Sequence, residues 1–400
     1  MNLFKKGEWN ILWPFYLNIL ITYSFFLVLP YWVIYFNEVG LTFTQLGIAW
    51  AVFSFSAILF EIPTGAVADI YGRKFSVILG GILTSIFLFL IIFAKEFYLI
   101  IILMALWGMA TTFSTGSYDA WVIDLLKFKR KNKLIHDFFI KLQSFATFGV
   151  LMGGLLASFS YKYFGISSLW VISSVSALIA TIILIFTAKE NFRRKNINLG
   201  KSFSETINIS KKGIKFSFKH DILRLLMLAS FFVVVSGAVS NLSWQPFLKD
   251  VGLPLEYLGI FYSGMAFVLI GVPFLQKPLL KLLKKEKYYL SLKVFLEIVF
   301  LLIIYFVISP LFAIILLILL AFLDELTPGV RITYFNKFIP SKIRATVGSV
   351  NSMFSGLAGA IGLIVGGLMI DAFGAQMTIV YSSLFLIPAL IFYMMIKEKV

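Results

Sequence analysis

The chain has 400 residues, of which 60% are hydrophobic and only 14% are charged, and its formal net charge is +16. Soluble domains carry about 25% charged residues, so this composition excludes an ordinary soluble fold. The absence of cysteine excludes disulfides, thiolate metal sites and cysteine nucleophiles.

Twelve apolar stretches follow one another along the chain. About 20 apolar residues cross a hydrocarbon core of about 30 Å as a helix. Helices are predicted because lipid cannot satisfy free backbone amides, and because the stretches do not alternate as barrel strands do. We expect membrane-spanning helices at residues 10–36, 43–68, 75–94, 97–124, 137–160, 167–188, 221–248, 255–275, 288–308, 311–336, 344–370 and 375–396. The predicted fold is an all-α membrane protein with 12 transmembrane helices.

A polar stretch divides these helices into six and six. Residues 189–220 are rich in Lys, Asn and Ser, which predicts a cytoplasmic linker between an N-terminal bundle at 1–188 and a C-terminal bundle at 221–400. Lys and Arg concentrate in the connections on the side of the two termini, and the positive-inside rule then places both termini in the cytoplasm. The plasma membrane is the expected location. The same rule accounts for the net charge without a nucleic-acid partner.

Two short motifs recur in the second half of the chain. Residues 39–48 read Val-Gly-Leu-x4-Leu-Gly-Ile, and residues 251–260 repeat this pattern about 212 residues later. Residues 153–155, Gly-Gly-Leu, recur at 366–368 with nearly the same offset. A shared offset indicates two related, pseudo-symmetric six-helix bundles. Transporters built from such repeats bind substrate between them, so the repetition favours transport.

The segment after the second span carries the most informative motif. It reads Glu61-Ile-Pro-Thr-Gly65-Ala-Val-Ala-Asp69-Ile-Tyr-Gly72-Arg73-Lys74. Gly72 suits a tight turn, Gly65 suits close helix approach, and Asp69 at the membrane edge needs a partner such as Arg73. The segment resembles the loop signature of the major facilitator superfamily, although Ile70 replaces the usual basic residue. Its lead-in, like the stretch from Ile339 to Val347, is similar to the multidrug-efflux-like bacterial and archaeal members.

The resemblance implies a gate on the cytoplasmic face. In this family the motif's Asp and Arg form a latch with an acid at the end of the fourth span, and Asp124 stands at that place here. We therefore expect a relay from Asp69 through Arg73 to Asp124. The alternative is that these are turn and topology residues with no switching role. The predicted gating residues are Gly65, Asp69, Gly72, Arg73, Lys74 and Asp124.

Ionisable residues inside spans are costly in lipid and mark functional candidates. Asp324 and Glu325 lie near the middle of the tenth span, where one of them is expected to face the pathway and carry a proton. The alternative is a structural pair bonded to Arg331. Glu61 is a further carrier candidate, or else a member of a salt-bridge cluster, together with Asp119 and Lys141. Lys293 and Glu297, four residues apart, predict a local ion pair.

Polar and aromatic side chains on the first and seventh spans are candidates for lining a substrate cavity. Many of the chain's aromatic residues are expected to be interface anchors or lipid-facing, so each candidate has a structural alternative. The cavity candidates are Asn18, Tyr23, Tyr31, Asn241, Trp244 and Gln245.

The function expected from these features is secondary active transport by alternating access. Proton-coupled efflux of a small hydrophobic or cationic compound is the leading hypothesis, with a symporter or uniporter for a nutrient or lipid-like solute as the alternative. An integral membrane enzyme is a remote alternative, because neither histidine lies in a span and no phosphate-binding or metal-binding spacing occurs. We expect a monomer with no cofactor, whose partners are a small-molecule substrate, a proton or other ion, and the lipid bilayer.

Overall fold

The computed structural model describes residues 4–191 and 213–397, and these residues form helices and short connections with no strand among them. The α-helices are α1 (Trp9–Phe25), α2 (Trp32–Glu38), α3 (Phe43–Tyr71), α4 (Arg73–Ile91), α5 (Phe97–Thr112), α6 (Ser117–Phe128), α7 (Leu134–Phe164), α8 (Ser167–Thr187), α10 (Asp221–Asp250), α11 (Leu258–Leu269), α12 (Gln276–Leu283), α13 (Glu286–Ile303), α14 (Pro310–Glu325), α15 (Pro328–Lys337) and α16 (Arg344–Met395). Most of the predicted linker lies outside the described residues.

The helices account for the twelve predicted spans. In the described part of the chain, ten helical segments are long and apolar enough to cross a membrane. One of them, within α16, turns at Gly374, where φ is 76° and ψ is 165°, so that it comprises two spans. The remaining span is α1, followed by α2. The prediction of an all-α, twelve-helix fold is confirmed.

Four spans are interrupted at places that the sequence analysis did not predict, and the first of them, predicted at residues 10–36, divides into α1 and α2. The fourth span breaks before Gly116, which has a φ of 71° and precedes α6. The eighth divides into α11 and α12, and the tenth into α14 and α15, where Pro328 begins the second part. Pro328 takes the first position of α15, where its missing N–H interrupts no hydrogen bond within that helix.

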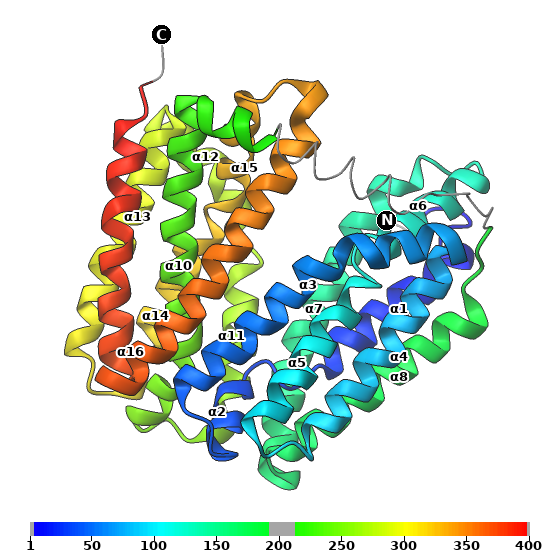
Figure 1. The fold of residues 1–400 in the computed structure, drawn as a ribbon, viewed down its shortest axis with the longest axis horizontal. Helices are drawn as coiled ribbons and strands as arrows, with labels where there is room; N and C mark the ends of the chain where they lie inside the picture. Colours follow the sequence, from blue (N-terminus) through cyan, green and yellow to red (C-terminus); the bar gives the residue numbers. More distant parts are fainter. Residues whose placement is uncertain (1–3, 192–212, 398–400) are drawn as a thin grey trace. The chain divides into compact units, whose positions relative to one another are not determined.

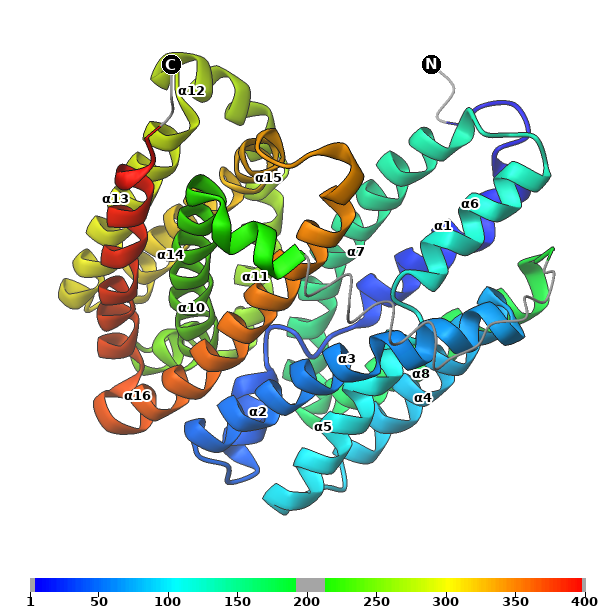
Figure 2. The same cartoon turned by 45° about the horizontal axis from the view of Figure 1, so that its top comes forward.

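The structure contains two compact units, and each includes a segment from the other half of the sequence. Unit 1 comprises Met1–Tyr35, Val52–Leu199 and Glu256–Ala266, and unit 2 comprises Phe36–Ala51, Gly200–Leu255 and Phe267–Val400. In unit 1, α1 packs on α7 and α8, and α4 packs on α8 and α5. In unit 2, α10 lies along α16 in both views of the ribbon (Figures 1 and 2).

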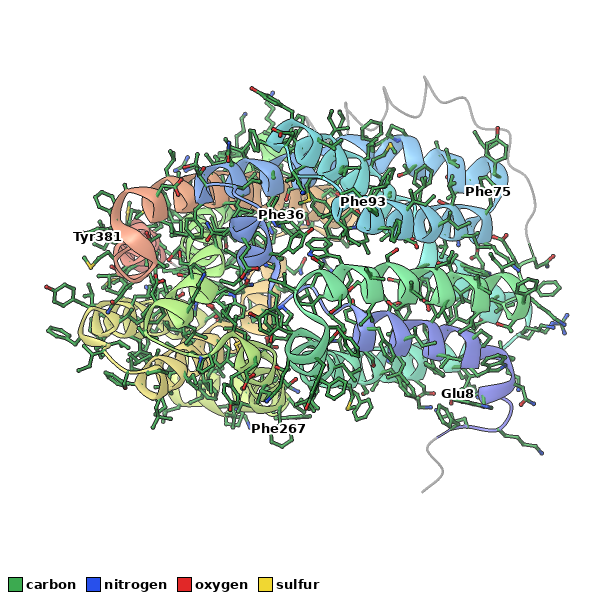
Figure 3. The ribbon with its side chains drawn as sticks, turned by 90° about the horizontal axis from the view of Figure 1, so that it is seen from below. Glu8, Phe36, Phe75, Phe93, Phe267 and Tyr381 are labelled. Atoms are coloured by element: carbon green, nitrogen blue, oxygen red, sulfur yellow. The ribbon has the colours of Figure 1, made fainter. Side chains whose placement is uncertain are left out.

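Small and polar residues hold the helices together. Between α4 and α8, the Ser85 hydroxyl donates to the Ser174 carbonyl oxygen at 2.8 Å, and between α10 and α16 the Ser236 hydroxyl donates to the Ser382 carbonyl oxygen at 3.0 Å. Helix pairs in lipid pack through such residues because burial from water gives no driving force there. Large apolar side chains remain outside, including Phe93 and Phe267, which are 64% and 66% exposed and are labelled in Figure 3.

Candidate functional site

The turn between α3 and α4 is formed by a glycine. Gly72 has a φ of 107° and a ψ of 151°, and it occupies the position before the first residue of α4. Residues with a side chain rarely adopt this backbone conformation, so the tight turn predicted at Gly72 depends on glycine.

Arg73 connects this turn to α6. Its Nη1 lies 2.6 Å from an Asp124 carboxylate oxygen and donates to the Ala120 carbonyl oxygen at 2.5 Å. The Asp124 side chain is 55% exposed, so water weakens the pair. A contact that is weak enough to break and reform is suited to a gate. The structure thus brings together two of the three members of the expected relay.

Glu190 was missed by the sequence analysis, although it is central to this turn. Its carboxylate accepts hydrogen bonds from the backbone N–H groups of Arg73 and Lys74 at 2.7 and 3.0 Å. These N–H groups begin α4, where the helix dipole favours a negative charge. The Lys74 ammonium in turn donates to the carbonyl oxygens of Ile185 and Ala188, at 2.8 and 2.7 Å, beside the last turn of α8. The motif is therefore joined to the sixth span as well as to the fourth.

Two expectations at this motif differ from the structure. Asp69 is half-buried in α3 and makes no hydrogen bond or ion pair with any residue that the structure describes, so the Asp69–Arg73 contact is absent here. A Cβ at Gly65 would meet no heavy atom within 4 Å, so the expected close helix approach is not observed at this position. The local spacing could not show this, because the partner of Asp69 depends on the tertiary arrangement.

A buried lysine links two carboxylates in unit 2. Lys293, whose side chain is 4% exposed, lies 2.6 Å from a Glu297 carboxylate oxygen and 2.7 Å from one of Asp324. The pair of Lys293 and Glu297 on α13 was predicted, whereas Asp324 on α14 was not expected to join it. Three ionised side chains would leave one excess negative charge. Such a triad can accept a proton or a cationic group, because a lone buried charge is costly.

The two acids of the tenth span have different surroundings. The Asp324 side chain is 56% exposed and is held by Lys293, whereas Glu325 is half-buried and its side chain forms no ion pair within the described range. Arg331 is not the partner of either acid, which corrects the structural alternative considered for them. The break that follows is stabilised by side chains, since Tyr289 donates to the Leu326 carbonyl oxygen at 2.9 Å. Asp324 is thus the accessible carboxylate of the triad.

The cluster expected from Glu61, Asp119 and Lys141 does not form. Glu61 and Asp119 are exposed, and Lys141 instead lies 2.5 Å from a carboxylate oxygen of Glu8. Glu8 is fully buried at the start of α1 (Figure 3) and also accepts a hydrogen bond from the Tyr16 hydroxyl at 2.8 Å. Glu8 could not be identified from the sequence, because it lies outside every apolar run.

The candidate cavity residues fall into two groups. Asn18 and Tyr31 are buried in helix contacts: the Asn18 amide donates to the Ala180 carbonyl oxygen at 2.9 Å, and the Tyr31 ring stacks on Tyr161. Gln245 is also fully buried. Tyr23 and Asn241 are exposed and Trp244 is half-buried, so burial does not assign these three to packing. Burial assigns the first group to packing.

The sequence matches a family model described as Major Facilitator Superfamily over residues 15–362. An uncharacterized transporter of this type, YxaM of Bacillus subtilis (strain 168), is 24% identical over 92% of this chain and 91% of its own. A protein of Lactococcus lactis subsp. lactis (strain IL1403) is 25% identical over 92% of this chain and 90% of its own, and its name is multi-drug resistance efflux pump PmrA homolog.

The fold is similar to that of solved transporters. A mutant of the nucleoside transporter NupG matches with a TM-score of 0.79, covering 95% of this chain and 98% of that chain at 16% sequence identity. At this identity the likeness concerns the fold alone.

Proposed function

Because the chain belongs to the major facilitator superfamily and is a membrane transporter of that family, we propose that it exports a small hydrophobic or cationic compound in exchange for protons. Its relatives include proteins named as multi-drug resistance efflux pumps, which supports an exporter rather than an importer. Alternating access between the two sides of the membrane is the proposed mechanism.

The observation that carries the proton exchange is the triad of Lys293, Glu297 and Asp324. Lys293 lies between the two carboxylates at 2.6 and 2.7 Å, and only Asp324 among the three is substantially exposed. A proton or a cationic substrate that binds at Asp324 neutralises the excess negative charge of the triad. The excess charge returns when the bound proton or substrate leaves. Binding of the two is thereby mutually exclusive, which is the requirement for antiport. Glu325 and Glu61 remain secondary candidates for the same role.

The turn at Gly72 is proposed as the gate on the side of the termini. Arg73 and Asp124 connect α4 with α6, and Glu190 and Lys74 connect α4 with the end of α8. Gly65 and Asp69 belong to the same proposal, although neither forms a contact of this kind with another described residue. We propose that these contacts form when the substrate path opens on the opposite side.

The test begins with a growth screen of an efflux-deficient host that expresses the chain across a panel of toxic compounds. A compound to which the chain gives resistance is then followed in proteoliposomes under an imposed pH gradient. We expect Asp324→Asn to reduce gradient-driven transport to the background of empty liposomes. Exchange of labelled for unlabelled cationic compound should be lost as well, because the Asn side chain mimics the protonated carboxylate, which excludes the substrate.

Asp221→Asn is the matched control, because Asp221 is an exposed carboxylate in unit 2 whose one ion-pair partner among the described residues is Arg224, one turn away. Gradient-driven transport by Asp324→Asn at the wild-type rate would remove Asp324 from the mechanism. Wild-type transport that is unchanged after nigericin collapses the pH gradient would remove proton coupling itself, leaving a uniporter or a symporter for another ion.

A further inference from the structure

The longer of the two repeated motifs, at residues 39–48 and 251–260, lies at the two segments that belong to the unit formed mainly by the other half of the sequence. The first copy, residues 39–48, lies within the Phe36–Ala51 segment of unit 2, and the helical part of the second copy lies within the Glu256–Ala266 segment of unit 1. The first helical turns of α3 thus pack with α16, and those of α11 pack with α7. The two copies of the motif therefore lie at two helix crossings of the same kind.

The glycines of the repeats meet at both crossings. A Cβ on Gly47 would overlap the Leu363 carbonyl oxygen, and one on Gly367 would overlap the Phe43 carbonyl oxygen. At the second crossing, a Cβ on Gly259 or Gly154 would overlap the carbonyl oxygen of the other residue. Each copy of the first motif therefore packs on the second motif from the other half of the sequence. Backbones can approach this closely only where side chains are absent.

The hydrogen bonds beside the two crossings differ in charge. At the first crossing, one turn after Gly367, the Asp371 carboxylate accepts from the backbone N–H groups of Phe43 and Thr44 at 3.0 and 2.8 Å. It also accepts from the Thr44 hydroxyl at 2.6 Å. These groups begin α3, where the unpaired N–H groups and the helix dipole attract a negative charge. The first crossing is thus closed by a carboxylate.

The second crossing has a neutral group at the equivalent position. Ser158 lies one turn after Gly154, and its hydroxyl accepts from the Ile260 N–H at 2.9 Å. The Tyr31 hydroxyl lies 3.4 Å from that of Ser158 and accepts from the Gly259 N–H at 3.3 Å. Hydrogen bonds to a charged acceptor are stronger than neutral ones, and although exposure of Asp371 to solvent reduces this advantage, the two crossings are related in position and differ in the charge of the acceptor.

We propose that Asp371 is a positioning residue for transport, whose carboxylate holds the start of α3 on α16 and sets how often this crossing opens. The crossing lies on the side opposite the termini, since residues 37–42 and 371–376 follow an odd number of spans. The inference rests on the alternating access of the proposed function. It adds that opening on this side is limited by one charged contact, while the Ser158 crossing opens more readily.

The absence of cysteine makes the experiment direct, because any introduced cysteine is the sole reactive thiol in the chain. Ala51 is the last residue of the Phe36–Ala51 segment and is 7% exposed, and Ser263 is the repeat-related residue at the second crossing and is 4% exposed. Ala51→Cys and Ser263→Cys therefore report separately on the two crossings. The rate of maleimide labelling is measured on purified protein in nanodiscs, without any substrate.

We expect Asp371→Asn to raise the labelling rate at Ala51→Cys by about five-fold, because the amide removes the charge that faces the helix N-terminus. The rate at Ser263→Cys should change by less than about two-fold, since that crossing does not involve Asp371. Thr44→Val removes one of the three hydrogen bonds and should give an intermediate increase. If Asp371→Asn is recovered in low yield, the labelling rate in Thr44→Val still tests the inference.

Glu38→Gln is the matched control, since Glu38 is an exposed carboxylate just before α3 that forms no hydrogen bond or ion pair with any described residue. An unchanged rate at Ala51→Cys in both Asp371→Asn and Thr44→Val would overturn the inference. An equal increase at Ala51→Cys and Ser263→Cys would overturn it too, because that pattern indicates general loosening. Failure of proton coupling with the labelling pattern intact would count against the proposed function alone.

Discussion

At the scale of single residues, the least expected contact is that of Glu8. Burial alone would raise the pKa of the Glu8 carboxyl, but hydrogen bonds from Lys141, the Lys5 amide and Tyr16 outweigh it and lower that pKa below its usual range. A carboxylate whose pKa is lowered by folding stabilises the folded state when it is ionised. Through its ion pair with Lys141, Glu8 holds the segment before α1 in contact with α7.

Replacement of Glu8 by Gln is expected to lower the midpoint of thermal unfolding by about 5 °C at pH 7, because Lys141 loses its buried partner. The pKa of Glu8 is lower in the folded protein than in the unfolded chain, so its stabilising effect is lost as the pH falls through the folded value. The difference between variant and wild type should therefore shrink below about pH 4. The difference in unfolding midpoint is measured by thermal unfolding of the two detergent-solubilised proteins at several pH values.

Glu96→Gln is the control, because Glu96 is exposed and its side chain makes no capping hydrogen bond at the start of α5. A Glu8→Gln variant that unfolds at the wild-type temperature at pH 7 would show that the contact contributes nothing to stability.

The Gly72 motif shows which single-residue contacts could be predicted. The pairing of Arg73 with Asp124 was expected from the resemblance of this motif to the family signature, and the structure contains this pair at 2.6 Å. Glu190 could not be predicted in the same way, because it lies in a polar stretch far from Arg73 in the sequence. Its role depends on the end of α8 reaching the start of α4, which is a matter of packing.

At the scale of helices, glycine contacts define two crossings whose partners lie far apart in the sequence. Gly259 on α11 faces the backbone of Gly154 on α7, whereas Gly264 on the same helix has no heavy atom within 4 Å of its would-be Cβ. Substitution by alanine is therefore expected to disturb the crossing at Gly259 and to be tolerated at Gly264.

Gly259→Ala is expected to force α11 away from α7, because the new methyl group would overlap a backbone oxygen that cannot move aside. We expect the labelling rate of Ser263→Cys to rise by about ten-fold, and resistance in the growth screen to fall, because the crossing no longer closes. Gly264→Ala should leave both measurements at the wild-type level. Equal behaviour of the two variants would show that the glycine contact does not control the crossing.

The spans themselves were predictable from composition, because each must present about 20 apolar residues to lipid wherever it packs. Their interruptions were not. The break in the tenth span places Asp324 near the end of α14. Pro328 begins the helix after the break, but the break could not be located from this proline in the sequence. Proline is tolerated within many membrane helices, so its presence alone does not locate a break.

At the scale of the whole molecule, the distribution of Lys and Arg predicts the orientation. We propose that both termini are cytoplasmic and that the chain works as a monomer in the plasma membrane, since both related halves of the transporter lie on one polypeptide. Green fluorescent protein fused after Val400 should fluoresce, and alkaline phosphatase at the same place should be inactive. Alkaline phosphatase inserted after Glu38 should be active.

The fusions are made in a bacterial host, where green fluorescent protein exported unfolded fails to fluoresce and alkaline phosphatase requires export to form its disulfides. The reverse pattern at both places would invert the orientation and place the Gly72 turn on the outer side. Insertion after Lys249, which precedes the eighth span, provides an independent check on the same side as Glu38.

The class of the protein, the number of its spans and the relationship between its two halves could all be predicted from the amino-acid sequence. These features follow from local properties, since lipid requires long apolar helices and a repeated motif is visible without knowing where it packs. Only the tertiary structure decided the partners: Asp324 with Lys293, Glu8 with Lys141, Glu190 with the start of α4, and Asp371 with the start of α3. Each of these contacts joins segments that are far apart in the sequence. Helix packing through glycine and serine brings these segments together, and the same residues could have packed in many other pairings.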